Sequence, residues 1–128
     1  MSTVLIVDDN SNVRTAIRAQ FERHSGFVVC GEAEDGAEAI VKAGELKPDL
    51  IILDLSMPVM NGFEAAKILR KMLPSVPLFL LTAHYGKVTE QAALDVGIRA
   101  VFAKHEDLRA LIAHARVVLA AGAAQGQA

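Results

Sequence analysis

Hydrophobic and polar positions along this chain form two alternating kinds of segment. The first kind is a short apolar run of four or five residues, found at 4–7, 27–30, 50–53, 78–82 and 100–103. Runs of this length, rich in Val, Ile and Leu, are typical of strands that are buried on both faces of a parallel sheet. The pattern therefore predicts five strands.

The second kind of segment has apolar residues three or four positions apart, which is typical of a helix with one buried face. The first helix shows this spacing at Val13, Ile17 and Phe21, and begins near Asn10 or Ser11, either of which can cap it. The other four helices are expected at about 36–46 with a cap at 35, from 61–62 to just before 74, at about 88–96, and from 106 or 107 onward.

Strands that alternate with helices of this length predict βαβ units with right-handed crossovers. We therefore expect an α/β fold in which a five-stranded parallel sheet is flanked by five helices, a doubly wound (βα)5 arrangement. A chain of 128 residues suits one domain, expected over residues 1–120. Residues 121–128 are only Ala, Gly and Gln, so we expect a frayed, disordered tail.

Composition and charge exclude several classes of protein. The net charge of −2 gives no bulk attraction to nucleic acid or to an anionic membrane. No apolar run approaches the roughly 20 residues that span a bilayer. Cys30 is the only cysteine, which rules out an intramolecular disulfide and suits a reducing compartment. We expect a cytoplasmic protein without a signal peptide, with no membrane contact and no direct nucleic-acid contact by this domain.

Polar residues stand where the apolar runs end. Asp8 and Asp9 follow the first run, Asp54 follows the third, Thr82 ends the fourth, and Lys104 follows the fifth. The carboxyl ends of strands in an open parallel sheet meet where such folds bind ligands. Three carboxylates brought together need a cation or a proton, because two like charges about 4 Å apart repel by roughly 4 kcal/mol at an effective dielectric near 20. The pattern predicts a Mg²⁺ site that holds a phosphoryl group beside a carboxylate nucleophile.

Each of these residues has a simpler interpretation when it is taken alone. Asp8 or Asp9 could favour the start of a helix, and Asp54 could be a turn residue at a strand end. Thr82 could be an ordinary β-former and Lys104 a solvated lysine. Their arrival in topological order at successive strand ends favours the common site.

With these motifs, the chain resembles the receiver domain of two-component response regulators over about residues 3–120. The motifs are Val7-Asp8-Asp9, Leu53-Asp54-Leu55-Ser56-Met57-Pro58, Asn61-Gly62, Leu81-Thr82-Ala83 and Lys104. The resemblance implies the flavodoxin-like strand order 2-1-3-4-5. It is compatible with a stand-alone receiver similar to a chemotaxis regulator and with the receiver of a longer regulator.

The resemblance also implies a role for each residue of the acidic site. Asp54 would accept the phosphoryl group and share the Mg²⁺ ion. Asp9 would bind the ion directly, Asp8 would act mainly through water, and the backbone carbonyl of Ser56 would be a further ligand.

Other residues would form the phosphoryl pocket. Lys104 would contact the phosphoryl group, Thr82 would turn toward it, and the small side chain of Ala83 would leave it space. Ser56 and His84 occupy the two positions that tune the lifetime of the phosphoryl group in the family. We expect His84 to cover the site partly and to affect the approach of hydrolytic water.

Two positions depart from the family pattern. Val101 stands where the family usually has a Tyr or Phe ring that moves with the switch threonine. Phe102 is adjacent, but neighbouring strand residues face opposite ways, so we expect Phe102 in the core between sheet and helix. His105 follows Lys104 where the family commonly has a cis proline, and a cis bond before another residue costs about 2.5–4 kcal/mol.

The function implied is a phosphorelay switch that changes a partner-binding or dimerisation surface. The phosphoryl donor would be a histidine kinase or a phosphotransfer protein, which would dock on the first helix near Arg14, Ala16 and Arg18. The output partner would be a downstream protein or a second copy of the chain, in a weak homodimer. We expect no enzyme activity beyond the domain's own aspartyl phosphorylation and dephosphorylation.

Three alternatives remain. A receiver-like interaction module that ignores phosphorylation is favoured by Val101 and His105. A hydrolytic phosphatase with an aspartyl-phosphate intermediate would need a second aspartate where this chain has Ser56. A flavodoxin-like cofactor carrier would need hydroxyls, glycines and free backbone N–H groups in the loop after the first strand, which is acidic here.

Overall fold

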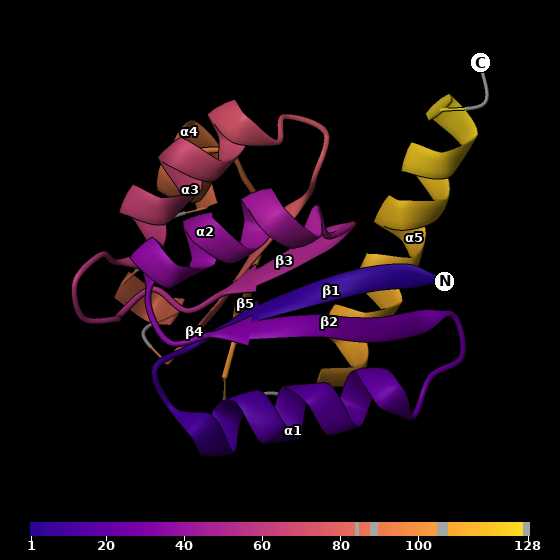
Figure 1. Ribbon diagram of the computed structural model, residues 1–128, viewed down its shortest axis with the longest axis horizontal. Coiled ribbons are helices and arrows are strands. Elements are labelled where there is room, and N and C mark those ends of the chain that lie inside the picture. The colour runs from indigo at the N-terminus through magenta and orange to yellow at the C-terminus, as the bar shows by residue number, and fades with distance from the viewer. Residues whose placement is uncertain (84, 88–89, 105–107, 127–128) are drawn as a thin grey trace.

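The central feature of the fold is a five-stranded parallel sheet (Figure 1). A computed structural model describes residues 1–83, 85–87, 90–104 and 108–126. The strands are β1 (Ser2–Val7), β2 (Phe27–Ala33), β3 (Leu50–Leu53), β4 (Leu78–Thr82) and β5 (Ile98–Ala103). Their order is β2-β1-β3-β4-β5, so the predicted fold class and strand order are confirmed.

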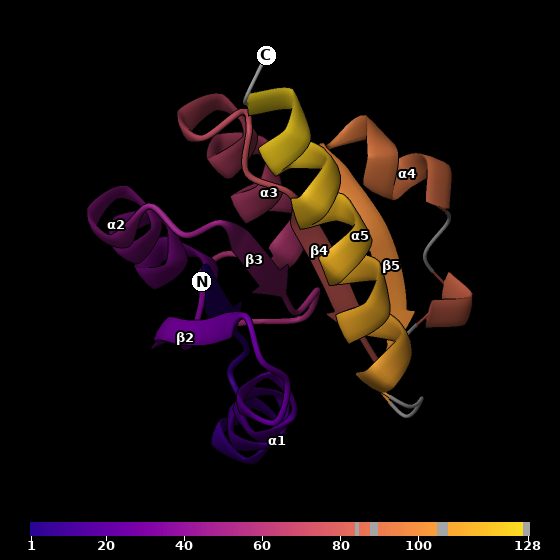
Figure 2. The same ribbon diagram turned by 90° about the vertical axis from the view of Figure 1, so that its right-hand side faces the viewer.

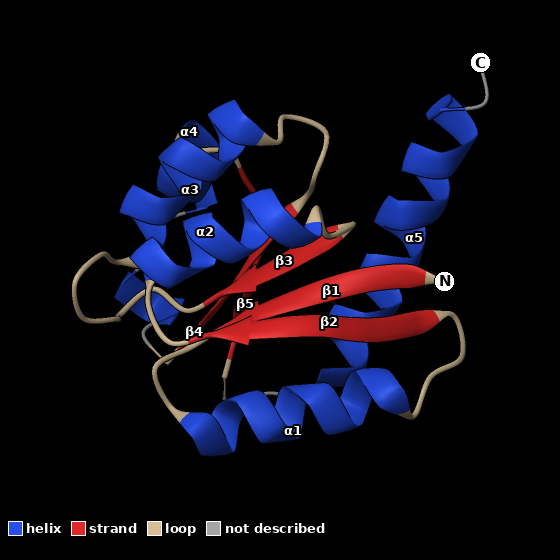
Figure 3. Ribbon diagram, in the orientation of Figure 1, coloured by secondary structure: helices blue, strands red, loops and turns tan. Residues whose placement is uncertain are grey.

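Five helices cover the two faces of the sheet, as Figure 3 shows by secondary structure. They are α1 (Ser11–Glu22), α2 (Gly36–Leu46), α3 (Gly62–Met72), α4 (Glu90–Asp95) and α5 (Leu108–Gly126). The helices α1 and α5 lie on one face, and α2, α3 and α4 lie on the other (Figure 2). This is the doubly wound arrangement that the alternating pattern predicts.

Each face of the sheet has its own hydrophobic core, because successive strand residues point to opposite sides. Under α1 and α5, Ile6 and Ile52 of the sheet meet Phe21 and Leu111 of the helices. On the other face, strand residues such as Leu53 meet a layer of small helix residues: Ala39, Ala43, Ala65, Ala66 and Ala93. The alanines allow the three helices to approach the sheet closely.

Polar caps start the helices at the carboxyl edge of the sheet. The Asn10 side chain accepts hydrogen bonds from the backbone N–H groups of Asn12 and Val13, which begins α1 directly after β1. Asp35 caps α2, as predicted. Asn61 forms a reciprocal capping box with Glu64 at the start of α3. These caps fix the loops that carry the acidic residues.

Several element boundaries differ from the expected ones. The strand β2 continues to Ala33, because its last residues pair with β1 as far as Val7. The helix α4 begins at Glu90, after a short 3-10 turn at Tyr85–Lys87; residues 88 and 89 of the expected helix lie outside the described residues, as do the candidate caps at 106 and 107.

The C-terminal segment also differs from the expectation of a disordered tail from residue 121. The helix α5 continues through that point to Gly126. Alanine has the highest intrinsic helix propensity, so an alanine-rich segment can extend a helix without packing against the core. Among the described residues, none of the helices has the length and apolar character that a bilayer crossing requires.

Candidate functional site

The sheet brings the predicted acidic residues together at its carboxyl edge. Asp8 and Asp54 directly follow β1 and β3, which are neighbours in the sheet. The backbone N–H of Asp54 donates to the Val7 carbonyl at 2.9 Å, and that of Asp8 donates to the Ala33 carbonyl at 3.0 Å. The parallel ladder is thus prolonged past the strand ends, and it holds both aspartates in register.

The three carboxylates are close enough to share one ion. Asp8, Asp9 and Asp54 each offer an oxygen atom, and these atoms lie within 4.8 Å of one another. Asp8 and Asp54 are only 1% and 3% exposed, whereas Asp9 is exposed. The cluster is therefore closed on the sheet side and open on the side of Asp9.

Lys104 supplies a positive charge to this cluster from the end of β5. Its Nζ lies 2.7 Å from Asp8 Oδ2 and 3.2 Å from Asp54 Oδ1. Burial alone would lower the pKa of Lys104, but the hydrogen bond to Asp8 and the charge of Asp54 outweigh it and raise the pKa. Lys104 is therefore a permanent cation at neutral pH.

One lysine does not neutralise the cluster. Burial, with the negative charge of Asp8 added, raises the pKa of Asp54 to about 6, although Lys104 acts in the opposite direction. The site thus still favours binding of a proton or a second cation near neutral pH. A second cation at this point would lower the pKa of Asp54 and leave it ionised.

The donor set fits Mg²⁺ in its chemistry. All three candidate side chains offer carboxylate oxygen, the kind of ligand that this hard ion takes, and Mg²⁺ usually keeps several waters on its open side. Ser56 is exposed and lines a hollow together with Asp9, Met57 and Asn61. The role of the Ser56 carbonyl as a further ligand stays a prediction.

The end of β4 and the turn that follows it contribute two small residues of the expected phosphoryl pocket. Thr82 is fully buried at the end of β4, and its carbonyl accepts a hydrogen bond of 2.9 Å from the Lys104 N–H. Ala83 is exposed in the turn that follows. The backbone therefore couples Thr82 directly to Lys104. The expectations for His84 and His105 fall outside the described residues.

Glycine is required where the connection from β3 to α3 passes the cluster. A Cβ atom on Gly62 would lie 2.3 Å from the Asp54 carbonyl oxygen. The Asn61-Gly62 motif thus has a packing reason that the sequence pattern did not reveal. In the same loop, Val59 is 83% exposed and has a φ of 68°, a backbone conformation that is strained for a β-branched residue.

The predicted orientation of Val101 and Phe102 is confirmed. Phe102 packs into the core under α5, with its ring 5.4 Å from that of Phe79 and 5.8 Å from that of His114. Val101 packs into the core on the opposite face. Phe102 therefore lies on the wrong face to replace an aromatic ring at position 101.

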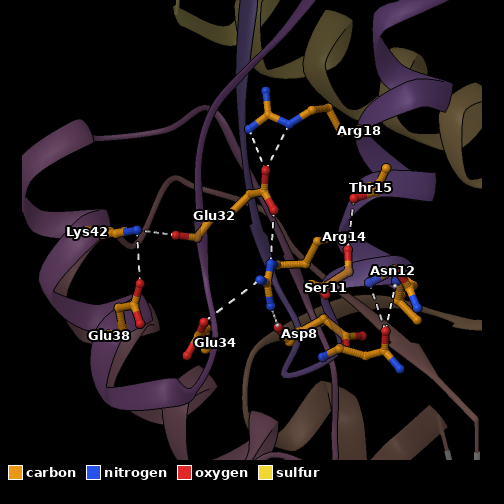
Figure 4. Close-up of polar contacts among 12 residues, drawn as sticks. Asp8, Ser11, Asn12, Arg14, Thr15, Arg18, Glu32, Glu34, Glu38 and Lys42 are labelled. Carbon is orange, nitrogen blue, oxygen red and sulfur yellow. Dashed lines mark hydrogen bonds and ion pairs between the residues drawn. The ribbon is translucent and has the colours of Figure 1, made fainter.

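A group of charged residues that sequence reasoning missed lies behind the acidic loop (Figure 4). Arg14 and Arg18, expected on the kinase-docking surface, both bind Glu32 of β2. Arg14 also donates to the Asp8 carbonyl at 2.6 Å. Glu32 was not expected to matter, because the strand was predicted to end at residue 30; a charged residue two positions after that apolar run was the available signal.

Comparison with known proteins identifies the family. The response regulator receiver domain family matches residues 4–116. This chain belongs to that family. Its fold is similar to that of the response regulator domain of Thermotoga maritima CheB, with a TM-score of 0.84, 28% identity and coverage of 93% of this chain and 96% of that chain. A LuxR-family response regulator from Aurantimonas sp. SI85-9A1 gives a TM-score of 0.88 at 29% identity, covering 94% and 86%.

Longer regulators are among the curated relatives of this receiver domain. A putative transcriptional regulator of Pseudomonas aeruginosa is 38% identical over 120 residues, covering 94% of this chain and 58% of the relative. Response regulator protein VraR of Staphylococcus aureus is 43% identical over 95 residues, covering 74% and 46%. The chain spans about half the length of the curated relatives it matches.

Proposed function

We propose that this receiver domain is a phosphorelay switch that accepts a phosphoryl group on Asp54 in the presence of Mg²⁺. The observation that carries the proposal is the contact of Lys104 Nζ with both Asp8 and Asp54, inside a cluster of three carboxylates. A structural ion pair would need one carboxylate. The cluster has excess negative charge, and the pKa of Asp54 is raised to about 6. Both features support a site that binds a metal ion and then a phosphoryl group.

In this proposal, Asp54, Lys104 and the other acidic residues have different roles in phosphoryl transfer. An ionised oxygen of Asp54 forms a bond to phosphorus while the bond from phosphorus to the donor's histidine nitrogen breaks. Lys104 transfers its hydrogen bond from Asp54 to an oxygen of the arriving phosphoryl group. Asp8, Asp9 and Asp54 would hold the Mg²⁺ ion, with the Ser56 carbonyl as a further ligand. When bound, the ion neutralises charge that develops on the phosphoryl oxygens.

Thr82 and Ala83 would shape the space next to the phosphoryl group, and Thr82 is tied to Lys104 through the backbone. Val101 provides no aromatic ring that could follow a movement of Thr82. We therefore propose that the signal leaves the site through the backbone at the ends of β4 and β5, and not through a side-chain rotamer at position 101.

The partners follow from this chemistry. A cytoplasmic histidine kinase or phosphotransfer protein would donate the phosphoryl group, and the output would be a changed surface for a downstream protein or a second copy. We propose no catalytic turnover of a separate substrate. The phosphorylation-insensitive module is the weaker candidate, because the complete set of Asp8, Asp9, Asp54, Thr82 and Lys104 has no use in it.

A mass-spectrometric experiment tests this proposal. The protein is incubated with a small-molecule phosphoryl donor, such as acetyl phosphate, with and without Mg²⁺. We expect a phosphoryl mass increment on the peptide containing Asp54 that requires Mg²⁺ and is absent from Asp54→Asn. Equal labelling of the variant, or no labelling of wild type, would contradict the proposal.

A further inference from the structure

Arg14 is a nearly buried cation on the far side of the acidic loop from Lys104. It lies in the first turn of α1, and its side chain is only 11% exposed. Burying a guanidinium group is costly unless its N–H groups find hydrogen-bond acceptors. The hydrogen-bond acceptors of the Arg14 guanidinium group therefore indicate the role of this residue.

Two acceptors fix the guanidinium group of Arg14 from two directions. Its Nη1 donates to the backbone carbonyl of Asp8 at 2.6 Å, and its Nε donates to Glu32 Oε1 at 2.9 Å (Figure 4). A third group, Glu34 Oε1, lies 3.9 Å from Nη2. Arg14 thus bridges the loop after β1 and the neighbouring strand β2.

Asp8 is consequently held at four points. Its N–H donates to the Ala33 carbonyl at 3.0 Å, and its carbonyl accepts from Arg14. Its Oδ1 accepts from the Asn10 N–H at 2.9 Å, and its Oδ2 pairs with Lys104 at 2.7 Å. The Arg14 contact sets the plane of the peptide group that joins Asp8 to Asp9, because the carbonyl lies in that plane.

Glu32 in turn holds Arg14 in place. Its other oxygen accepts hydrogen bonds from Arg18 Nε at 2.9 Å and Nη2 at 2.6 Å. Burial would raise the pKa of Glu32, but the hydrogen bonds from Arg18 and Arg14 outweigh it and lower the pKa. Glu32 is therefore ionised at neutral pH, and two arginines share its charge.

We propose that Arg14 is a positioning residue for the metal site. It orients the peptide group between Asp8 and Asp9, so that the exposed carboxylate of Asp9 faces Asp54. Its contact with the acidic loop is to the backbone carbonyl of Asp8 and uses no carboxylate oxygen of Asp8, whereas Lys104 pairs directly with the carboxylates of Asp8 and Asp54. This inference deepens the proposed function and rests on Mg²⁺ binding at the acidic cluster.

The test uses the full chain and two readouts, Mg²⁺ affinity by calorimetry and the backbone amide signals of Asp9 and Asn10 in metal-free protein. We expect Arg14→Gln to weaken Mg²⁺ binding about tenfold, as is typical when a group that orients a metal ligand is removed. The two amide signals should shift without metal. Arg14→Lys keeps the positive charge, but a lysine ammonium group cannot reproduce the planar guanidinium that bonds the Asp8 carbonyl and Glu32 together. Its Mg²⁺ affinity should therefore be only slightly higher than that of Arg14→Gln.

Arg116→Gln is the matched control. Arg116 also donates to a backbone carbonyl, that of Ser25 at 3.0 Å, but at the opposite end of the sheet. The Arg116→Gln variant loses one positive charge and this hydrogen bond, and it should still bind Mg²⁺ as wild type does. If Arg14→Gln does not fold, Glu32→Ala replaces it, because it removes the oxygen that accepts from the Nε of Arg14; both readouts should then change in the same direction, by less.

Two results would overturn the role of Arg14. One is unchanged Mg²⁺ affinity and unchanged Asp9 and Asn10 signals in the folded variant. The other is full recovery in Arg14→Lys, which would mean that charge alone is sufficient. Failure of wild type to bind Mg²⁺ would instead contradict the proposed function, and the amide signals of metal-free protein would still decide whether Arg14 orders the loop.

Discussion

Asp54 must be ionised to act as a nucleophile, yet its surroundings favour the protonated acid. Its carboxyl group is buried beside the charge of Asp8, and its pKa is raised to about 6. When an acid has a higher pKa in the folded than in the unfolded protein, its ionisation makes the folded protein less stable. This loss of stability is absent below the ordinary aspartate pKa near 4, grows between pH 4 and 6, and is complete above pH 6.

Asp54→Asn should therefore stabilise the metal-free protein at neutral pH. The gain should be roughly 1–3 kcal/mol at pH 7.5, since each pKa unit corresponds to about 1.4 kcal/mol. It should be clearly smaller at pH 4.5. Urea unfolding of both proteins in the presence of a chelator measures the difference. An equal effect of the substitution at both pH values would show that the charge of Asp54 is not a source of instability.

At the scale of elements, the connection from β3 to α3 determines how closely a helix can approach the acidic cluster. Its N–H groups are used within the loop: Gly62 donates to the Leu55 carbonyl at 2.9 Å, and Met60 donates to the Pro58 carbonyl at 2.7 Å. Met60 also accepts a hydrogen bond of 3.1 Å from Gly36 at the start of α2. The loop is therefore tied to a second helix, and it has little freedom to move away from a side chain at position 62.

Gly62→Ala should lower the free energy of unfolding by about 2 kcal/mol or more, because the new Cβ would overlap the Asp54 carbonyl and the backbone cannot yield cheaply. It should also weaken Mg²⁺ binding by displacing Asp54. Gly122→Ala is the control, since Gly122 lies in α5 with no atom near its Cβ position. That change should stabilise the protein by about 0.5–1 kcal/mol through helix propensity. Similar effects of the two substitutions in urea unfolding would contradict this account of the loop.

Elements determined by a few neighbouring residues could be predicted from the sequence, whereas elements determined by distant contacts could not. The strand β3 and the cap Asp35 were predictable because apolar runs and capping side chains act over a few residues, and Asn10 was one of the two candidate caps for α1. The length of β2 was not, because Glu32 interrupts the apolar pattern and its carboxylate is held by two arginines of α1, which lie far from it in sequence. The strained backbone of Val59 likewise depends on the route of the whole loop.

The same distinction applies to the site. Asp8, Asp9, Asp54 and Lys104 were predictable, because parallel strands place their carboxyl ends at one edge whatever the details of packing. The role of Arg14 was not, since a helix pattern does not reveal which arginine finds an acceptor on another strand.

At the scale of the whole molecule, the acidic cluster lies at one edge of a sheet whose two faces have separate cores. A change at Lys104 or Thr82 can reach both cores, because β5 directs Phe102 to one face and Val101 to the other. The α4 side of the sheet and the α5 side are thus both connected to the site through β5. This connection gives the proposed switch a route to a partner surface that does not need an aromatic residue at position 101.

The most direct test of the central claim is an NMR titration with beryllofluoride, a phosphoryl analogue, in the presence and absence of Mg²⁺. We expect saturable shifts of backbone amides at Asp9, Asp54 and Lys104 that extend along β5 and into α4. They should require Mg²⁺ and be absent from Asp54→Asn. Shifts confined to the acidic cluster would mean binding without a switch, and no response in wild type would contradict the account altogether.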